Sequence, residues 1–177
     1  MARDAAVRAI QLVDHDPEWA RAFENQRQQL LQTIGAYIDE VYHVGSTSIA
    51  GLCAKPKIDI DCVLRAEALL PQAVERIKSQ DGYTFHGDPY QDGMWTFTQG
   101  HGSWGTRLYL CGPDNRIHRD RMLFRDYLRK NPGRAQAYGK LKRQLAVDAV
   151  GDWKHYTGGK AGFVAETVRL ALLDQSR

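Results

Sequence analysis

Two periods run through the apolar positions of this chain, one typical of helices and one typical of strands. Apolar residues recur at helical spacing from Trp19 to Ile34, after the helix-start pair Asp16-Pro17, and predict a first helix. Apolar residues alternate with other residues over residues 57–64, which predicts a strand. The same criteria predict strands at residues 41–44, 83–86, 95–98 and 106–111, and helices at residues 69–81, 117–130, from 132 onward and from 162 onward.

The order of these elements indicates an α+β protein. A helix comes first, a mixed sheet follows, and a run of helices ends the chain. The 177 residues contain no repeat and no long linker, so we expect one domain over residues 1–177. Its sheet-rich core should cover about residues 36–112, and its C-terminal helices about residues 116–175.

Composition and cysteine usage point to a globular protein of the cytoplasm. The hydrophobic fraction of 43% and the charged fraction of 25% are ordinary values for a folded chain. No apolar run approaches the roughly 20 residues that a membrane span needs, so we expect no membrane partner. The cysteines Cys53, Cys62 and Cys111 show neither a disulfide framework nor zinc-ligand spacing.

Positive charge is concentrated in the second half of the chain. Residues 107–160 contain thirteen Lys and Arg against five Asp, although the net charge of the whole chain is only +3. Such a stretch suits a polyanionic partner, either a triphosphate or RNA. The alternative is that these side chains form solvated helix faces, because phosphate binding requires the charges to converge in space.

The candidate chemistry begins with a small, hydroxylated turn and continues with two carboxylates. In residues 43–48, His-Val-Gly-Ser-Thr-Ser, a glycine lets the backbone approach phosphate oxygens, and hydroxyl and N–H groups can donate to them. Turns of this composition also occur for purely conformational reasons. Asp59 and Asp61 stand two residues apart on the strand predicted at residues 57–64, so both project from one face, about 7 Å apart. Two such carboxylates repel one another unless a divalent cation lies between them, and Mg²⁺ prefers one or two carboxylates together with phosphate oxygens.

Residues 43–48, together with residues 55–61 (Lys-Pro-Lys-Ile-Asp-Ile-Asp), resemble the GrpB family within the polymerase-beta-like nucleotidyltransferase superfamily. The resemblance extends to residues 14–19 (Asp-His-Asp-Pro-Glu-Trp), to residues 123–129 (Leu-Phe-Arg-Asp-Tyr-Leu-Arg), and to Lys160 with Phe163. It therefore covers nearly the whole chain. It implies a nucleotidyltransferase-like mixed sheet flanked by helices, with a helical C-terminal segment.

The resemblance also implies a set of site residues. Asp59 and Asp61 would be catalytic and would bind Mg²⁺ or Mn²⁺, with a nucleoside triphosphate, ATP by expectation, as co-substrate. The candidate phosphate-binding residues are His43, Gly45, Ser46, Thr47, Ser48, Lys55, Lys57, Arg107, Arg125 and Lys160. For several of these a structural role is an alternative: a hydrogen bond for His43, charge balance for Lys55 and Lys57, and an ion pair within its helix for Arg125.

The chain departs from the superfamily pattern at one functional position. A third carboxylate usually comes from a neighbouring strand, but the strand predicted at residues 106–111 has Arg107 and Tyr109 and no acid. Asp88 and Asp92 are possible substitutes, with turn residues as the alternative. Ala50 also stands where relatives commonly have proline.

The first hypothesis is a metal-dependent nucleotidyltransferase that moves a nucleoside monophosphate to a hydroxyl or phosphate acceptor. The acceptor is a small molecule, a protein or an RNA, and the sequence does not choose among them. Two alternatives follow from the departures and from the charge pattern. One is a catalytically silent nucleotide-binding module, and the other is an RNA-binding protein that uses the basic helices of residues 116–143. The oligomeric state is not visible in the sequence.

Overall fold

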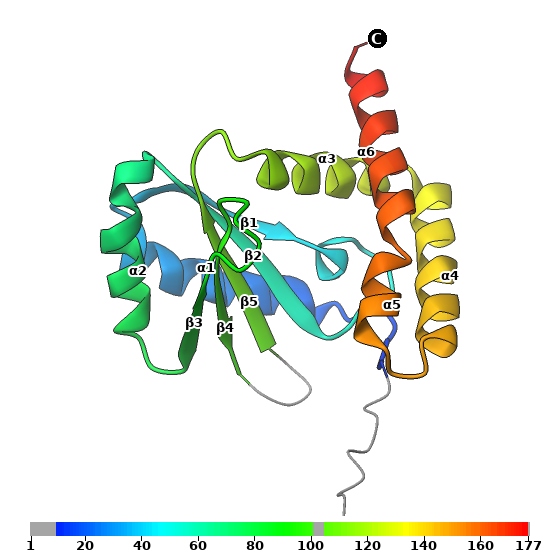
Figure 1. The fold of residues 1–177 in the computed structure, drawn as a ribbon, viewed down its shortest axis with the longest axis horizontal. Coiled ribbons are helices and arrows are strands. Elements are labelled where there is room, and N and C mark those ends of the chain that lie inside the picture. The colour runs from blue at the N-terminus through cyan, green and yellow to red at the C-terminus, as the bar shows by residue number, and fades with distance from the viewer. Residues whose placement is uncertain (1–9, 101–104, 177) are drawn as a thin grey trace, which may run out of the picture.

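The structure is a computed structural model that describes residues 10–100 and 105–176. Its core is a five-stranded sheet in the order β1-β2-β5-β4-β3 (Figure 1). The strands are β1 (Ile38–Val44), β2 (Lys57–Leu64), β3 (Tyr83–Gly87), β4 (Trp95–Gln99) and β5 (Gly105–Cys111). The helices are α1 (Glu18–Ile34), α2 (Leu70–Lys78), α3 (Arg116–Lys130), α4 (Pro132–Asp148), α5 (Trp153–Gly158) and α6 (Ala161–Gln175), with short 3₁₀ turns η1 (Ser46–Ser48) and η2 (Glu67–Leu69).

The sheet is mixed, as the sequence predicts for an α+β protein. Strand β2 pairs antiparallel with β1 and parallel with β5, and β5 then pairs antiparallel with β4. The register places Asp59 opposite Arg107 and Asp61 opposite Tyr109. Because side chains alternate along a strand, these four side chains share one face of the sheet.

The opposite face of the sheet forms the main hydrophobic core. Ile58, Ile60 and Cys62 of β2 are at most 2% exposed and pack with apolar side chains of α1 and α2. Each fully buried side chain of this kind contributes about 1.5–3 kcal/mol. The strand is therefore held by its apolar face, and its acidic face is left for other contacts.

Helices α3 to α6 form a second cluster beside the acidic face. Phe124 and Leu128 of α3 pack with Tyr138 of α4 and with Phe163 and Val164 of α6. Figure 1 shows α3 across the top and α4, α5 and α6 on the right, with α2 at the far left and α1 behind the sheet. No helix in the described part of the chain is long and apolar enough to cross a membrane.

The predicted elements agree with the structure except that α2 ends at Lys78, three residues before its predicted end, and at two further places. Strand β1 starts at Ile38, three residues before its predicted start, because Ile38 is 1% exposed and pairs with Leu64. Helix α5 was not predicted. Its six residues are too few to show a helical period, although Asp152 caps its first turn by accepting hydrogen bonds from the Lys154 and His155 N–H groups.

Candidate functional site

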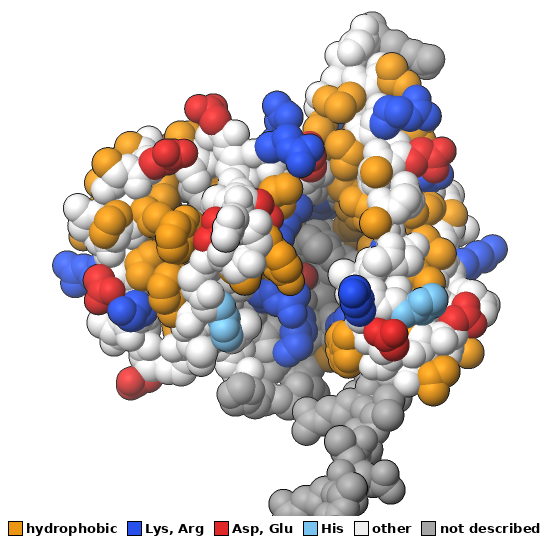
Figure 2. All heavy atoms as spheres, in the orientation of Figure 1, with side chains coloured by type: hydrophobic (Ala, Val, Ile, Leu, Met, Phe, Trp, Pro, Cys, Tyr) orange, Lys and Arg blue, Asp and Glu red, His pale blue; other side chains and the backbone are white. Residues whose placement is uncertain are grey.

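A cavity of about 570 Å³ opens between the acidic face of the sheet and helix α5. Residues from β2, β3, β4, β5, η1, α4 and α5 line it, together with residues of the connecting loops. Figure 2 shows Lys and Arg side chains gathered in the hollow between the sheet and helices α5 and α6. A volume of this size is in the range of small-molecule and cofactor sites.

The lining of this cavity is strongly cationic. Five of its side chains are Lys or Arg and one is a carboxylate, Asp59. The cations are Lys55, Lys57, Arg107, Lys142 and Lys160. Among the described residues, these five side chains form one ion pair, between Arg107 and Asp59 at 4.0 Å. The cavity therefore contains positive charge that the protein does not neutralise by itself.

Helix α5 holds two of these lysines against aromatic rings. Lys55 Nζ lies 3.9 Å from the ring centroid of Trp153 and 4.3 Å from that of Tyr156, and Lys160 Nζ lies 4.4 Å from Tyr156. Burial, helped by the charge of Lys160, lowers the pKa of Lys55 to about 8. Burial likewise lowers the pKa of Lys160. An anion in the cavity would favour the protonated form of both.

The turn after β1 brings backbone and carboxylate into close contact. Gly45 has φ +71°, and a Cβ at this position would lie 2.5 Å from Asp59 Oδ2. Only glycine satisfies both conditions, the left-handed backbone and the missing side chain. Lys142 supports the turn from α4, because its Nζ donates to Ser46 Oγ at 2.9 Å and also to the Cys53 carbonyl. Burial lowers the pKa of Lys142 to about 8.

Asp59 lines the cavity, and one of its two carboxylate oxygens makes no hydrogen bond to the described residues. Its Oδ1 is buried and has no hydrogen-bond partner among the described residues. Burial raises the pKa of this carboxyl, although the charges of Arg107 and Arg121 oppose the rise. A buried, unpaired carboxylate oxygen is costly and is common at functional sites.

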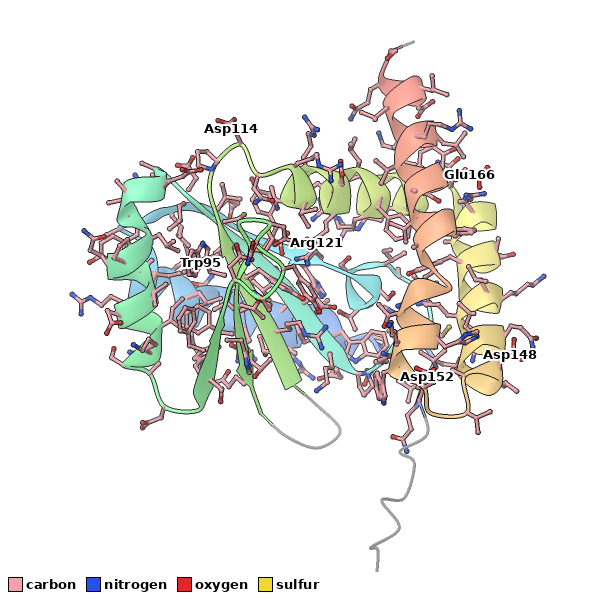
Figure 3. All side chains as sticks on the ribbon, viewed as in Figure 1. Trp95, Asp114, Arg121, Asp148, Asp152 and Glu166 are labelled. Carbon is pink, nitrogen blue, oxygen red and sulfur yellow. The ribbon has the colours of Figure 1, made fainter. Side chains whose placement is uncertain are left out.

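Asp61, on the same face of the same strand, is closed off. Its side chain is 0% exposed, and both oxygens are in use. Arg121 Nη1 donates to Oδ1 at 2.7 Å, and His118 Nδ1 donates to Oδ2 at 3.0 Å. Figure 3 shows Arg121 reaching from α3 toward the sheet. The guanidinium also lies 4.0 Å over the Tyr109 ring.

These contacts bear on the magnesium predicted between the two carboxylates. The described residues contain no group of three or more His, Cys, Asp or Glu side chains that could hold a metal ion. Asp59 Oδ1 makes no hydrogen bond to the described residues, but it is buried and lies 4.0 Å from Arg107 Nη1, and a cation on Asp61 requires Arg121 to leave. The residues present therefore do not fit a divalent ion bridging Asp59 and Asp61 in this arrangement.

Of the residues predicted to bind phosphate, the structure places Ser46, Thr47, Lys55, Lys57, Arg107 and Lys160 in the cavity. His43 lies behind them. It stacks on Phe23 at 4.6 Å and bonds to Thr47 Oγ1, and burial lowers its pKa to about 4, so it is neutral. Ser48 Oγ donates to the Gly45 carbonyl, and Arg125 donates to the His43 carbonyl. Thus His43, Ser48 and Arg125 stabilise the turn and do not line the cavity.

The candidates for a third acid do not reach the site. Asp88 accepts hydrogen bonds from the Asp92 and Gly93 N–H groups, and Asp92 accepts one from Met94 N–H. Both are turn residues, which was the alternative for them. On β5, Arg107 and Tyr109 occupy the positions opposite Asp59 and Asp61.

Several residues of the site had no recognisable signal in the sequence. Lys142 contacts Ser46 across 96 residues, and Arg121 contacts Asp61 across 60. The only local hint was the spacing of His118 and Arg121, three residues apart and therefore on one side of α3. Trp153, Tyr156 and Thr157 were missed together with α5.

The mixed sheet, its acidic strand and the glycine turn before it define an α+β fold that solved structures share. The structure of the GLD-2/RNP-8 complex matches this fold with a TM-score of 0.56 at 12% identity over 78% of this chain and 58% of the other. At this identity the likeness shows the fold alone.

The chain belongs to the GrpB family, because the family model described as "GrpB protein" matches residues 9–169. The crystal structure of the conserved protein GrpB from Enterococcus faecalis has a TM-score of 0.80 and 30% identity, over 94% of this chain and all of that one. The UPF0157 protein BH1888 of Halalkalibacterium halodurans is 32% identical over 92% of this chain and 83% of its own length. The UPF0157 protein YqkA of Bacillus subtilis is 31% identical over 86% of this chain, which spans only 44% of YqkA.

Proposed function

We propose that the protein binds a nucleoside triphosphate in the cationic cavity and transfers its nucleoside monophosphate to a hydroxyl or phosphate acceptor. The observation that carries this proposal is the charge of the cavity, where five Lys and Arg side chains surround one carboxylate. A triphosphate is an anion of matching size and sign. Membership of the GrpB family and the nucleotidyltransferase-like fold support the same choice.

The proposed reaction uses positioning and charge. The acceptor oxygen attacks the α-phosphorus, the bond from that phosphorus to the bridging oxygen breaks, and pyrophosphate leaves with the bonding electrons. Lys55, Lys142 and Lys160 lie where they can neutralise the phosphates. Asp59, the one carboxylate in the cavity, accepts the acceptor's proton. The magnesium expected from the sequence stays an expectation, and no step here depends on it.

A binding experiment tests the first half of this proposal. ATP, CTP, GTP and UTP are titrated calorimetrically, with Mg²⁺ and separately in EDTA, into the wild type and into Lys55→Met/Lys160→Met. We expect binding of at least one triphosphate and a loss of at least about tenfold in the double variant, since two desolvated charges are removed. Lys130→Met/Lys140→Met, two exposed lysines on α3 and α4, is the matched control and should bind like the wild type. If no triphosphate binds at millimolar concentration, the proposal is rejected.

A transfer experiment tests the second half. Pyrophosphate release is followed with the triphosphate that binds best and a screen of small-molecule, protein and RNA acceptors. Asp59→Asn should abolish release and leave triphosphate binding within about threefold, because the carboxylate acts on the acceptor's proton. Release that is unchanged in Asp59→Asn would remove Asp59 from the mechanism.

The second candidate is a nucleotide-binding module without transfer. It is favoured by the positions opposite the carboxylates on β5, where Arg107 and Tyr109 stand in place of an acid. It predicts triphosphate binding with no pyrophosphate release in any acceptor screen. The third hypothesis, RNA binding by the basic helices, has less support, because Arg121, Arg125, Arg129 and Lys142 bond to protein groups inside the fold.

A further inference from the structure

Arg121 stands where the sequence predicts a metal ion. Its guanidinium donates to Asp61 Oδ1 at 2.7 Å, and Asp61 is 0% exposed. The charge of Arg121 also acts on Asp59, since burial raises the pKa there and the charges of Arg107 and, second to it, Arg121 lower it. One fixed cation thus stabilises both carboxylates of β2, which is the task that a divalent ion performs in the predicted site.

The position of Arg121 is fixed from three sides. Asp61 accepts its hydrogen bond, the Tyr109 ring lies 4.0 Å beneath its guanidinium, and α3 carries it in a well-packed segment between Ile117 and Phe124. His118, one turn away on α3, occupies the second oxygen of Asp61. A divalent ion reaching Asp61 would have to break two charged hydrogen bonds in a buried place.

The charge of the cavity also favours a ligand without a bound metal ion. Its five cations face a single carboxylate, so an anion of about four charges completes the balance. A metal-free triphosphate carries a charge of about −4 at neutral pH, because the last ionisation of its terminal phosphate lies near pH 6. A bound Mg²⁺ cancels about two of these charges, which would leave part of the cationic lining uncompensated.

We infer that the protein takes its triphosphate free of divalent metal, with Arg121 as the built-in cation at the two carboxylates and Asp61 as the residue that positions Arg121. This inference rests on the proposed triphosphate pocket and names the form of the ligand. It assigns different roles to the two carboxylates, since Asp59 faces the ligand and Asp61 faces Arg121.

The first test uses the wild-type protein alone. ATP is titrated calorimetrically in EDTA and, separately, with Mg²⁺ in excess, at equal ionic strength. We expect a dissociation constant in EDTA that is equal to or lower than that with Mg²⁺. Binding only with Mg²⁺ overturns the inference and leaves the proposed function in place, whereas no binding in either buffer overturns the proposed function as well.

The second test measures Mn²⁺ binding by electron paramagnetic resonance without any nucleotide. Arg121→Met should bind Mn²⁺ at least about tenfold more tightly than the wild type, because it frees Asp61 and keeps an unbranched apolar side chain. Arg121→Met/Asp61→Asn should lose this gain, and Arg116→Met, an exposed arginine on the same helix, should bind like the wild type. If the wild type already binds Mn²⁺ as tightly as Arg121→Met, the inference is wrong. Should Arg121→Met fail to fold, the EDTA titration of the wild type decides.

Discussion

Asp59 and Asp61 are two residues apart on β2 and share one face of the sheet, yet their surroundings are opposite. Around Asp59 the sheet opens into the cationic cavity, and Oδ1 has no hydrogen-bond partner among the described residues. Around Asp61 the sheet is covered by α3, and Arg121 and His118 occupy both oxygens. Strand β2 supplies two carboxylates, and the helices that pack on it determine which of them lines the cavity.

The difference shows how a fold can keep one acid reactive and make its neighbour structural. A carboxylate that is buried with a bonded cation contributes to stability only while the pair is intact. A carboxylate that is buried without a partner costs stability and gains a raised pKa. Asp61 belongs to the first kind. Asp59 is closer to the second, because it is partly buried, makes only a long contact of 4.0 Å with Arg107, and has a raised pKa.

The largest expected effect is the loss of stability in Asp61→Ala. Removing this carboxylate leaves the Arg121 guanidinium without its counter-charge beneath α3, and breaking such a buried pair costs about 3–5 kcal/mol. Urea denaturation at pH 7 measures the change. A cost below about 1 kcal/mol would show that Asp61 and Arg121 do not form a buried ion pair in solution.

The next effect concerns the glycine that separates the turn from Asp59. Gly45→Ala should cost about 2–3 kcal/mol, because it combines left-handed backbone strain with a contact of 2.5 Å to Asp59 Oδ2. Gly51→Ala is the matched control, with φ +74° and no atom within 4 Å of its added Cβ, and should cost only about 1 kcal/mol. Equal costs for the two variants would mean that the turn does not press against Asp59.

A substitution of Lys142 tests whether the cavity beside Asp59 binds an anion. Lys142→Met should weaken triphosphate binding by about tenfold and lower stability by only about 1 kcal/mol, because the hydrogen bonds lost at Ser46 and Cys53 are partly offset by removal of a buried ammonium group. Lys140→Met, on the exposed side of α4, should change neither. Isothermal titration and urea denaturation give the two readouts. A large loss of stability in Lys142→Met would assign this lysine to the fold and not to the ligand.

The pH dependence of binding tests the same lysines. Lys55 and Lys142 each have a pKa of about 8, so both are protonated at pH 7 and lose their protons above pH 8. Triphosphate affinity should therefore be highest below pH 8 and at least about tenfold lower at pH 9. Titrations at constant ionic strength check this. Lys142→Met should show a shallower decline than the wild type, and an unchanged slope would rule out Lys142 as a titrating contact.

The smallest effect is expected for Asp59→Asn. Burial raises the pKa of Asp59 in the folded protein, so its ionised form destabilises the fold as pH rises above the value for the unfolded chain. Removing that charge should raise stability at pH 7 by up to about 1 kcal/mol, in contrast to Asp61→Ala. The gain should shrink as the pH falls and Asp59 takes up its proton in the wild type. A loss of stability at pH 7 would indicate that Asp59 has a stabilising partner.

Much of this fold was predictable because its elements have clear periods. The alternation over residues 57–64 predicted β2 with its observed ends, and the GrpB resemblance predicted the nucleotidyltransferase-like arrangement. Helix α5 was not predictable in the same way, since six residues show no helical period. The aromatic side chains that α5 contributes to the cavity lining were therefore not predicted either. The pair Asp59 and Asp61 was recognised, but the difference between them was not.

The sequence by itself determined the α+β class, the acidic face of β2 and the need for glycine before it, because these follow from local alternation and backbone sterics. Only the tertiary structure decided that Arg121 bonds to Asp61, that Lys142 supports Ser46, and that Asp59 Oδ1 has no hydrogen-bond partner among the described residues. The contacts of Arg121 and Lys142 join residues 60 and 96 positions apart. Side chains so distant in the chain meet only when helix packing places them, and no periodicity in one sequence records which helix face will cover which carboxylate.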